Sequence, residues 1–274
     1  MQVFLFLVLT VLCNAYEQPI RCVNFYGIET EKEIPVCSWI NPPDYYLSHL
    51  IKEWNLTTVR IPFSQEYISK RNFTVLDNLI NTTTSLNLTS ILDWHRNKNT
   101  HQSPYPPHSW YEDWTIVLDR YNSNSLVFGV GLYNEFQTND VMNISQLQTE
   151  LRAKLRERYP QRFHYFVGCH SWGTNCTGLN VTVDNDTTIE IHRYPFNQGN
   201  HSEVFPQKPF IGETGWNDMK WGQEFLSFLS DNHYWDVCFW TISQSQDTGG
   251  VWENDCKTIN LERLTMMKNF WGHA

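Results

Sequence analysis

The stretch from Leu88 to Tyr133 decides the fold class of this chain. It contains the apolar run LTSILDW (88–94), the amphipathic segment WYEDWTIVLDRY (110–121) and a second apolar run LVFGVGLY (126–133). Short apolar runs bounded by polar residues are typical of strands, and a helix-period segment between two of them is typical of a parallel crossover. The stretch therefore predicts a strand, a covering helix and a second strand parallel to the first.

The same unit recurs along the whole chain. Eight strand candidates alternate with helix-period segments in 274 residues, which predicts an α/β fold, a single-domain (β/α)8 TIM barrel. An open doubly wound sheet is the alternative, but no Gly-rich phosphate loop follows the first strand. The strand candidates are Cys22–Ile28, Thr57–Pro62, Leu88–Trp94, Leu126–Tyr133, Phe163–Gly168, Thr188–His192, Pro209–Gly212 and Val237–Ile242. The clearest helical segments are Pro43–Trp54, Trp110–Tyr121, Ser145–Arg158 and Trp221–Ser230.

An apolar run near the N-terminus predicts secretion. Val3–Leu12 is apolar except for Thr10, and it has the length of a signal-peptide core, too short to span a bilayer. We therefore expect residues 1–15 to be a signal peptide and residues 16–274 to be a secreted, extracellular domain. An uncleaved membrane anchor is the alternative. No other stretch approaches ~18 apolar residues, so we expect no membrane span after cleavage.

Cysteines and glycosylation sequons agree with secretion. Six cysteines remain after cleavage, an even number that suits a disulfide framework. They form three couples that are close in sequence, and although other connectivities are open, we expect the bridges Cys22–Cys37, Cys169–Cys176 and Cys238–Cys256. The dense Asn-x-Ser/Thr sequons predict glycosylation at Asn55, Asn72, Asn81, Asn87, Asn143, Asn180, Asn185 and Asn200. A further sequon, at Asn175, is the least favourable because its middle residue is Cys176.

Composition restricts the class of partner. The net charge of −9 argues against a nucleic-acid partner, because phosphate binding needs clustered Lys and Arg, and here these residues are scattered. The chain has 12 Trp, and flat aromatic side chains at loop tips are suited to stacking on the apolar faces of sugar rings. We expect a monomer.

Polar side chains stand at the ends of six of the eight predicted strands. Barrel enzymes place their chemistry at the carboxyl ends of the strands, and such a set is difficult to explain as core packing. The strand-end residues are Arg60, Asp93 with His95, Asn134 with Glu135, His192 with Tyr194, Glu213 and Trp240.

Two of these residues, Glu135 and Glu213, are carboxylates that follow buried-looking strands. For either alone, an ion pair that closes the barrel rim is an equally good interpretation. Together they match glycoside hydrolysis, in which one carboxylic acid protonates the leaving oxygen and the other attacks the anomeric carbon or activates water. A separation of about 5 Å between them would imply retention of configuration, and roughly 6.5–9.5 Å would imply inversion.

The strand-end motifs, taken in order, resemble glycoside hydrolase family 5. The resemblance extends from the first strand, Val23–Gly27, to the last helix, and two patches, at 172–175 and 247–250, are similar to its endo-β-1,4-glucanase branch. The family motifs are matched by VRIP (59–62), LDWH (92–95), NE (134–135), HRY (192–194), GETG (212–215) and FW (239–240).

The resemblance implies roles for the matched residues. Glu135 would be the acid/base and Glu213 the nucleophile, with Arg60 and Tyr194 hydrogen-bonded to Glu213 to keep it ionised and oriented. A cation and a phenol donor both favour the charged form of a carboxylate.

Other matched residues would contact the sugar. Asn134 would bind the 2-hydroxyl group, His95 and His192 would line the cleavage subsite, and Trp240 would be the floor under the reacting ring. We expect Asp93 to brace the loop rather than to react. Three further tryptophans are candidate platforms for outer sugars, and packing in the core is an equally good interpretation of them. They are Trp39, Trp110 and Trp172. Phe136 stands where many members have proline, which affects substrate fit more than activity.

The leading hypothesis is a retaining hydrolase that cleaves internal bonds of a β-1,4-glucan, with a β-linked polysaccharide or oligosaccharide as its partner. Related activities on mannan or β-1,3-glucan are alternatives, as is a glycan-binding surface glycoprotein that uses the pocket without turnover. A zinc hydrolase using His95, His192 and the glutamates is less favoured, because no closely spaced His motif is present. We expect no metal and no cofactor.

Overall fold

The computed structural model of this protein describes residues 19–95, 104–196, 207–243 and 248–274. Its strands form a closed barrel in which each pairs in parallel with the next and β8 pairs with β1. The strands are β1 (Arg21–Asn24), β2 (Thr58–Phe63), β3 (Thr89–Trp94), β4 (Val127–Gly131), β5 (His164–Gly168), β6 (Thr187–Arg193), β7 (Phe210–Thr214) and β8 (Val237–Phe239). The predicted (β/α)8 barrel is confirmed.

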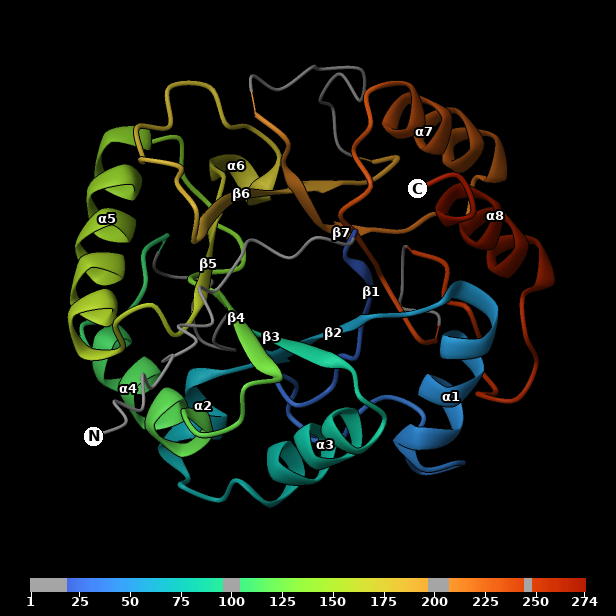
Figure 1. The fold of residues 1–274 in the computed structure, drawn as a ribbon, viewed down its shortest axis with the longest axis horizontal. Coiled ribbons are helices and arrows are strands. Elements are labelled where there is room, and N and C mark those ends of the chain that lie inside the picture. The colour runs from blue at the N-terminus through green and yellow to red at the C-terminus, as the bar shows by residue number, and fades with distance from the viewer. Residues whose placement is uncertain (1–18, 96–103, 197–206, 244–247) are drawn as a thin grey trace, which may run out of the picture.

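Helices surround the strands, as Figure 1 shows. Two predicted helices have the expected bounds, Pro43–Trp54 and Trp110–Tyr121, because both carry a buried apolar stripe that packs on the barrel. No helix within the described ranges is both long and apolar enough to cross a bilayer. The helices are α1 (Pro43–Trp54), α2 (Gln65–Ser69), α3 (Thr74–Ser85), α4 (Trp110–Tyr121), α5 (Val141–Arg158), α6 (His170–Gly173), α7 (Met219–Asp231) and α8 (Leu261–Trp271).

The interior of the barrel changes from apolar to polar along the strands. Near their amino ends, a separate buried cluster is made by Ile20, Cys22, Ile91, Phe166, Phe210 and Cys238. Side chains two residues apart on a strand face the same side, so Asn24 follows Cys22 and Asp93 follows Ile91 on the inward face, and both polar residues are fully buried. An apolar plug therefore closes one end of the barrel, and a polar layer lies above it toward the carboxyl ends.

Two of the three predicted disulfide pairings are wrong. The bridges are Cys22–Cys238 and Cys37–Cys256, not Cys22–Cys37 and Cys238–Cys256, whereas Cys169–Cys176 is as predicted. Barrel closure is the physical reason. It makes β1 and β8 neighbours, so Cys22 stands opposite Cys238 in the register of the two strands although 216 residues separate them.

Candidate active site

The predicted nucleophile, Glu213, lies inside the barrel mouth on β7 and its side chain is 5% exposed. Arg60 Nη1 donates to Glu213 Oε1 at 2.8 Å, and the Tyr194 hydroxyl donates to Oε2 at 2.9 Å. Both hydrogen bonds expected from the sequence are therefore present. Burial, followed by the charge of Glu213, raises the pKa of Tyr194 well above its usual value, so this phenol keeps its proton and remains a donor.

A bulge in β7 gives Glu213 its orientation. The register between β6 and β7 shifts after the pair Ile191–Ile211, so that His192 stands opposite Glu213 and Gly212 is the extra residue. Bulges re-aim side chains and are frequent beside active sites. Here the bulge turns a carboxylate into the mouth beside His192.

Arg60, on β2, is the centre of the polar layer. It is fully buried, and burial alone would lower its pKa, but neighbouring carboxylates raise the pKa above its ordinary value. It therefore stays a cation at any working pH. A buried cation needs anionic and hydrogen-bonding partners to balance its charge. Besides Glu213, its guanidinium nitrogens contact Asn24 Oδ1 at 2.9 Å, Asn134 Oδ1 at 2.8 Å, Asp93 Oδ1 at 3.0 Å and Glu190 Oε1 at 2.8 Å.

The predicted acid/base, Glu135, follows β4 and has a more open environment. Its side chain is 23% exposed, and within the described part of the chain its hydrogen-bond partner is His192, whose Nδ1 lies 3.0 Å from Glu135 Oε1. Glu135, His192 and Glu213 each offer one atom within 4.8 Å of the others. One oxygen of Glu135 and one of Glu213 thus lie within 4.8 Å of each other, a close approach that suits the short separation of retaining enzymes.

His192 is a charged histidine in a buried position. Burial alone would lower its pKa, but the charge of Glu213 and hydrogen bonds to Glu135 and Glu190 raise the pKa to about 10. Both ring nitrogens then carry protons, Nδ1 toward Glu135 and Nε2 toward Glu190 at 3.3 Å. Gly173 packs against the ring, where an added Cβ would lie 3.0 Å from Cγ, so the ring has little freedom to turn.

Asp93, His95 and Trp240 form a second group at the mouth. Asp93 Oδ2 lies 2.6 Å from His95 Nδ1, in agreement with the expected bracing role of the aspartate. Burial alone would lower the pKa of His95, but the hydrogen bond and charge of Asp93 raise it. The Trp240 ring stacks at 5.8 Å from His95 and at 5.5 Å from Tyr26, which fixes the plane predicted to carry the sugar.

The sequence from residue 13 to 231 matches the family model described as cellulase, glycosyl hydrolase family 5. This chain belongs to glycosyl hydrolase family 5. An endoglucanase of Paenibacillus polymyxa is 22% identical over 323 aligned residues, which cover 89% of this chain and 81% of that protein.

Solved structures with the same fold agree. An endocellulase of Pyrococcus horikoshii in complex with cellotetraose has a TM-score of 0.79 at 18% identity, with 92% of each chain covered. The catalytic domain of the major endoglucanase of Xanthomonas campestris pv. campestris has a TM-score of 0.77 at 18% identity, with 93% of this chain and 95% of that one covered. These structures share the fold, and membership of the retaining family 5 makes the protein a glycosyl hydrolase.

The structure separates the three tryptophans predicted as outer platforms. Trp39 and Trp172 are 60% and 53% exposed, which suits stacking on a sugar. Trp110 is buried, and its Nε1 donates to Leu132 O at 2.9 Å. That prediction is wrong for Trp110, because the first turn of α4 packs its indole under the loop that carries Glu135.

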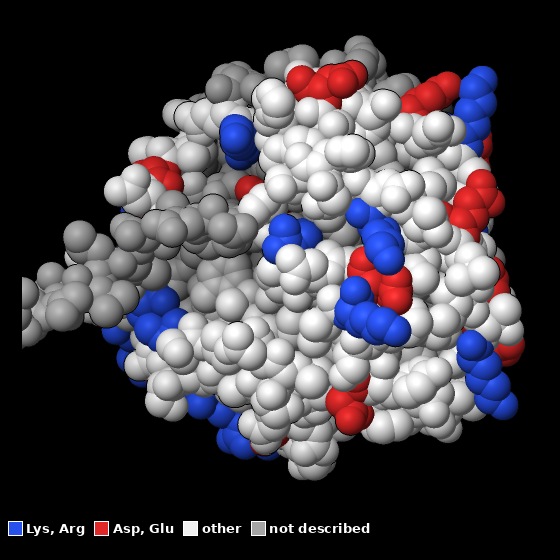
Figure 2. Space-filling model, turned by 45° about the vertical axis from the view of Figure 1, so that its right-hand side comes forward, with Lys and Arg blue, Asp and Glu red and all other residues white. Residues whose placement is uncertain are grey.

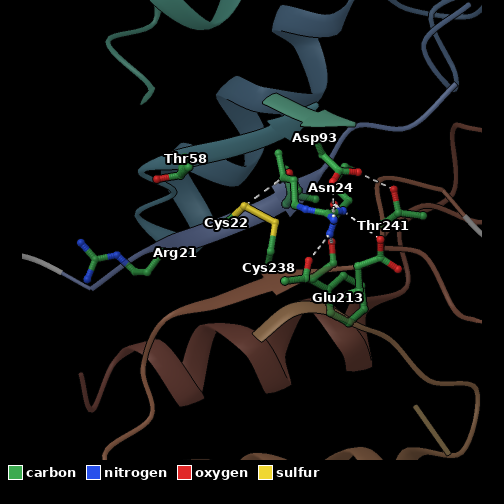
Figure 3. Close-up of a disulfide and its surroundings, with 12 residues drawn as sticks. Arg21, Cys22, Asn24, Thr58, Asp93, Glu213, Cys238 and Thr241 are labelled. Atoms are coloured by element: carbon green, nitrogen blue, oxygen red, sulfur yellow. Dashed lines mark hydrogen bonds and ion pairs between the residues drawn. A yellow bond between two sulfur atoms is a disulfide. The ribbon is translucent and has the colours of Figure 1, made fainter. Parts of the chain in front are cut away.

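Two residues of the polar layer were missed from the sequence, Asn24 and Glu190. Asn24 Nδ2 donates to Gly212 O at 3.0 Å, and Figure 3 shows Asn24 with the Cys22–Cys238 bridge and Glu213 around it. Glu190 lies in the middle of β6 rather than at its end, so it is not part of the strand-end pattern. The period of two was the available signal, since Glu190 precedes His192 by two residues.

The same atoms are a candidate metal site. Glu135, His192 and Glu213 are close enough to share an ion. Their atoms are already engaged, however: both oxygens of Glu213 accept hydrogen bonds from Arg60 and Tyr194, and the His192 ring is held as a cation between carboxylates. A metal needs a neutral imidazole with a free nitrogen lone pair, so this donor set does not fit a cation.

Proposed function

We propose that this family 5 hydrolase cleaves internal β-1,4 bonds of a β-glucan by double displacement, with Glu213 as nucleophile and Glu135 as acid/base. The observation that carries the proposal is the contrast between the two carboxylates. Glu213 is enclosed and accepts two hydrogen bonds, whereas Glu135 reaches the open side of the mouth within 4.8 Å of it.

In the first step, Glu213 attacks the anomeric carbon while Glu135 gives its proton to the departing glycosidic oxygen. The C–O bond to the leaving sugar breaks and a glycosyl ester to Glu213 forms. In the second step, Glu135 takes a proton from water, the resulting hydroxide attacks the same carbon, and Glu213 is released as a carboxylate. The proton ends on Glu135, and the product keeps the β configuration.

The remaining residues are assigned to substrate binding. Asn134 would hold the 2-hydroxyl of the reacting sugar, since its amide is fixed by Arg60 at 2.8 Å, and this bond strengthens as charge develops at the anomeric carbon. Trp240 would carry the reacting ring, and Trp39 and Trp172 would carry neighbouring sugars. The printed names of the relatives, endoglucanase and endocellulase, favour a β-1,4-glucan over mannan or β-1,3-glucan.

We also propose that the protein acts outside the cell as a glycosylated monomer. Three disulfides suit an oxidising compartment. The predicted signal peptide and the sequon at Asn200 lie outside the described residues, and Asn143 is partly exposed. On the face drawn in Figure 2, basic and acidic side chains are intermixed, in keeping with a carbohydrate rather than a nucleic-acid partner. Of the predicted glycosylation sites, the exposed ones are Asn55, Asn72, Asn81, Asn87, Asn180 and Asn185.

The test is an assay of new reducing ends on soluble β-1,4-glucan, β-1,3-glucan and mannan, with the Glu213→Gln variant as the blank. We expect release from the β-1,4-glucan by the wild type alone, with a rapid fall in viscosity because internal bonds are cut. Binding of a glucan without any release across a range of pH would instead support a glycan-binding protein. Activity that a chelator abolishes would support a metal hydrolase.

A further inference from the structure

Glu190 is a buried carboxylate that the mechanism above does not use. It lies on β6, is 3% exposed and precedes His192 by two residues, so both side chains face the interior of the barrel. The chain makes space for it at the bulge of β7, because a Cβ at Gly212 would lie 2.0 Å from Glu190 Oε1. Any side chain at position 212 would therefore clash with the Glu190 carboxylate.

A single oxygen of Glu190 contacts both of the cations that hold the catalytic pair. Oε1 lies 2.8 Å from Arg60 Nη2 and 3.3 Å from His192 Nε2. The other end of each cation reaches a catalytic carboxylate, Arg60 Nη1 to Glu213 at 2.8 Å and His192 Nδ1 to Glu135 at 3.0 Å. The contacts thus form one continuous chain in the order Glu213, Arg60, Glu190, His192, Glu135.

Glu190 also balances the charges of the buried polar layer. Two buried cations, Arg60 and His192, face Asp93, Glu190 and Glu213 from β3, β6 and β7. A raised pKa favours the charged form of His95 beside Asp93, and the phenol of Tyr194 stays neutral. Glu135 lies on the far side of His192, and Glu29 is a further carboxyl group near His95 and Asp93. Without the negative charge of Glu190, the net charge of the buried layer would be one unit more positive, which would favour the ionised form of any carboxyl group beside it.

We propose that Glu190 is a positioning residue that couples the two catalytic carboxylates, fixing Arg60 on the side of Glu213 and the imidazolium of His192 on the side of Glu135. The proposal rests on the function assigned above, since it takes Glu213 and Glu135 as the reacting groups. Glu190 itself does not touch the substrate. Its effect is on the orientation and charge of its two neighbours.

Replacement of Glu190 by Gln tests the coupling most directly. The amide keeps the size of the side chain but loses its charge, and we expect the pKa of His192 to fall by about one unit or more, as for loss of an adjacent opposite charge. We expect kcat to fall by up to roughly 100-fold through misplacement of the reacting groups, with KM changed little. The loss should be similar for glucans and for activated aryl glycosides, because both carboxylates are displaced. Glu190→Asp keeps the charge, so it should retain part of kcat and should return the pKa of His192 most of the way to its wild-type value.

The experiment is a titration of the His192 ring by ¹⁵N-detected NMR in the wild type and in Glu190→Gln, run beside the kinetic pH profiles. His164 is the internal reference, because it lies at the amino end of β5 and its low pKa, about 4, arises from burial. Asp236→Asn is the matched control. Asp236 is a partly buried carboxyl group that accepts from Ile20 N, next to the amino ends of β1 and β8, so we expect its loss to leave His192 and the pH profile unchanged.

The titration does not need turnover, so it separates this proposal from the proposed function. A wild-type His192 that titrates near 6.5 would overturn the coupling even if Glu190→Gln fails to fold. An unchanged His192 titration in a folded Glu190→Gln variant would overturn it as well. A lowered His192 titration with no hydrolysis by the wild type would support the coupling and reject the enzyme.

Discussion

The β7 side and the β4 side of the barrel mouth carry the same functional group in two different settings. On the β7 side, Glu213 is 5% exposed and accepts hydrogen bonds from Arg60 and Tyr194. On the β4 side, Glu135 is 23% exposed and is held through His192. The contrast shows how one residue type can serve two roles: donors that fix a carboxylate suit a nucleophile, and an open, lightly held carboxyl group suits proton exchange.

The local sequence produces this contrast. The bulge at Gly212 turns Glu213 inward toward the buried guanidinium. Glu135 instead follows a strand that ends at Gly131, in a loop whose Leu132 carbonyl accepts hydrogen bonds from the indoles of Trp110 and Trp114. Buried aromatic rings thus anchor the base of the Glu135 loop and leave its carboxyl group at the surface of the mouth.

The largest effect is expected from Glu213→Gln. The change removes the nucleophile and keeps the shape, so kcat should fall by about 10⁴-fold or more on every substrate. Steady-state rates on cellotetraose and on an activated aryl cellobioside would measure it, with circular dichroism to confirm an intact fold. Residual activity within tenfold of the wild type would remove Glu213 from the mechanism.

Glu135→Gln should separate the two substrates instead of affecting them equally. A natural glucan has a poor leaving group and needs the proton, so its kcat/KM should fall by roughly 10²- to 10⁴-fold. A dinitrophenyl glycoside needs little protonation, and its glycosylation step should be much less affected. Equal losses on both substrates would show that Glu135 is not the proton donor.

Tyr194→Phe removes only the hydroxyl group that donates to the nucleophile Glu213. Loss of the 2.9 Å hydrogen bond to Glu213 Oε2 should lower kcat by about 10- to 100-fold, as for one hydrogen bond to a charged group. Both substrates should be affected, since the attack itself is weakened. A loss confined to the poor leaving group would instead connect Tyr194 to the function of Glu135.

The disulfides extend the comparison to stability. Cys22–Cys238, shown in Figure 3, joins β1 to β8 across 216 residues. Cys169–Cys176 closes a seven-residue separation after β5, close in sequence to Trp172. Chain entropy predicts a loss of about 5 kcal/mol on removing the first bridge and about 2 kcal/mol on removing the second. Urea unfolding of the two double-Ala variants would measure this order. A larger loss for the short bridge would contradict the entropic account.

The smallest effect concerns two histidines whose pKa values are shifted in opposite directions. The raised pKa of His192, about 10, means that its contribution to stability is full below pH 6.5 and is lost as pH rises through 10. Burial lowers the pKa of His164 to about 4, so its contribution is present above pH 6.5 and is lost as pH falls through 4. Between pH 7 and 4, His164→Gln should therefore lose less unfolding free energy than the wild type. Parallel curves for the two proteins would contradict this assignment.

The fold and most of the site could be predicted because both follow from local patterns. Apolar runs separated by helical periods determine the barrel, and the carboxyl ends of its strands determine where polar residues such as Arg60 and Glu213 meet. The disulfide pairing could not be predicted in this way, because the contact between Cys22 and Cys238 exists only once the barrel closes. Glu190 was missed because it lies inside β6; the period of two places it on the face of His192, but its contact with Arg60 is known only from the folded barrel.

The most direct test of the central claim is covalent trapping with an activated 2-deoxy-2-fluoro-β-cellobioside, which slows both steps but the second more. Peptide mass spectrometry after digestion would locate the label. The account predicts one added glycosyl group per chain, attached to Glu213, and none in Glu213→Gln. A label on Glu135, or hydrolysis with inversion and no label at all, would contradict it.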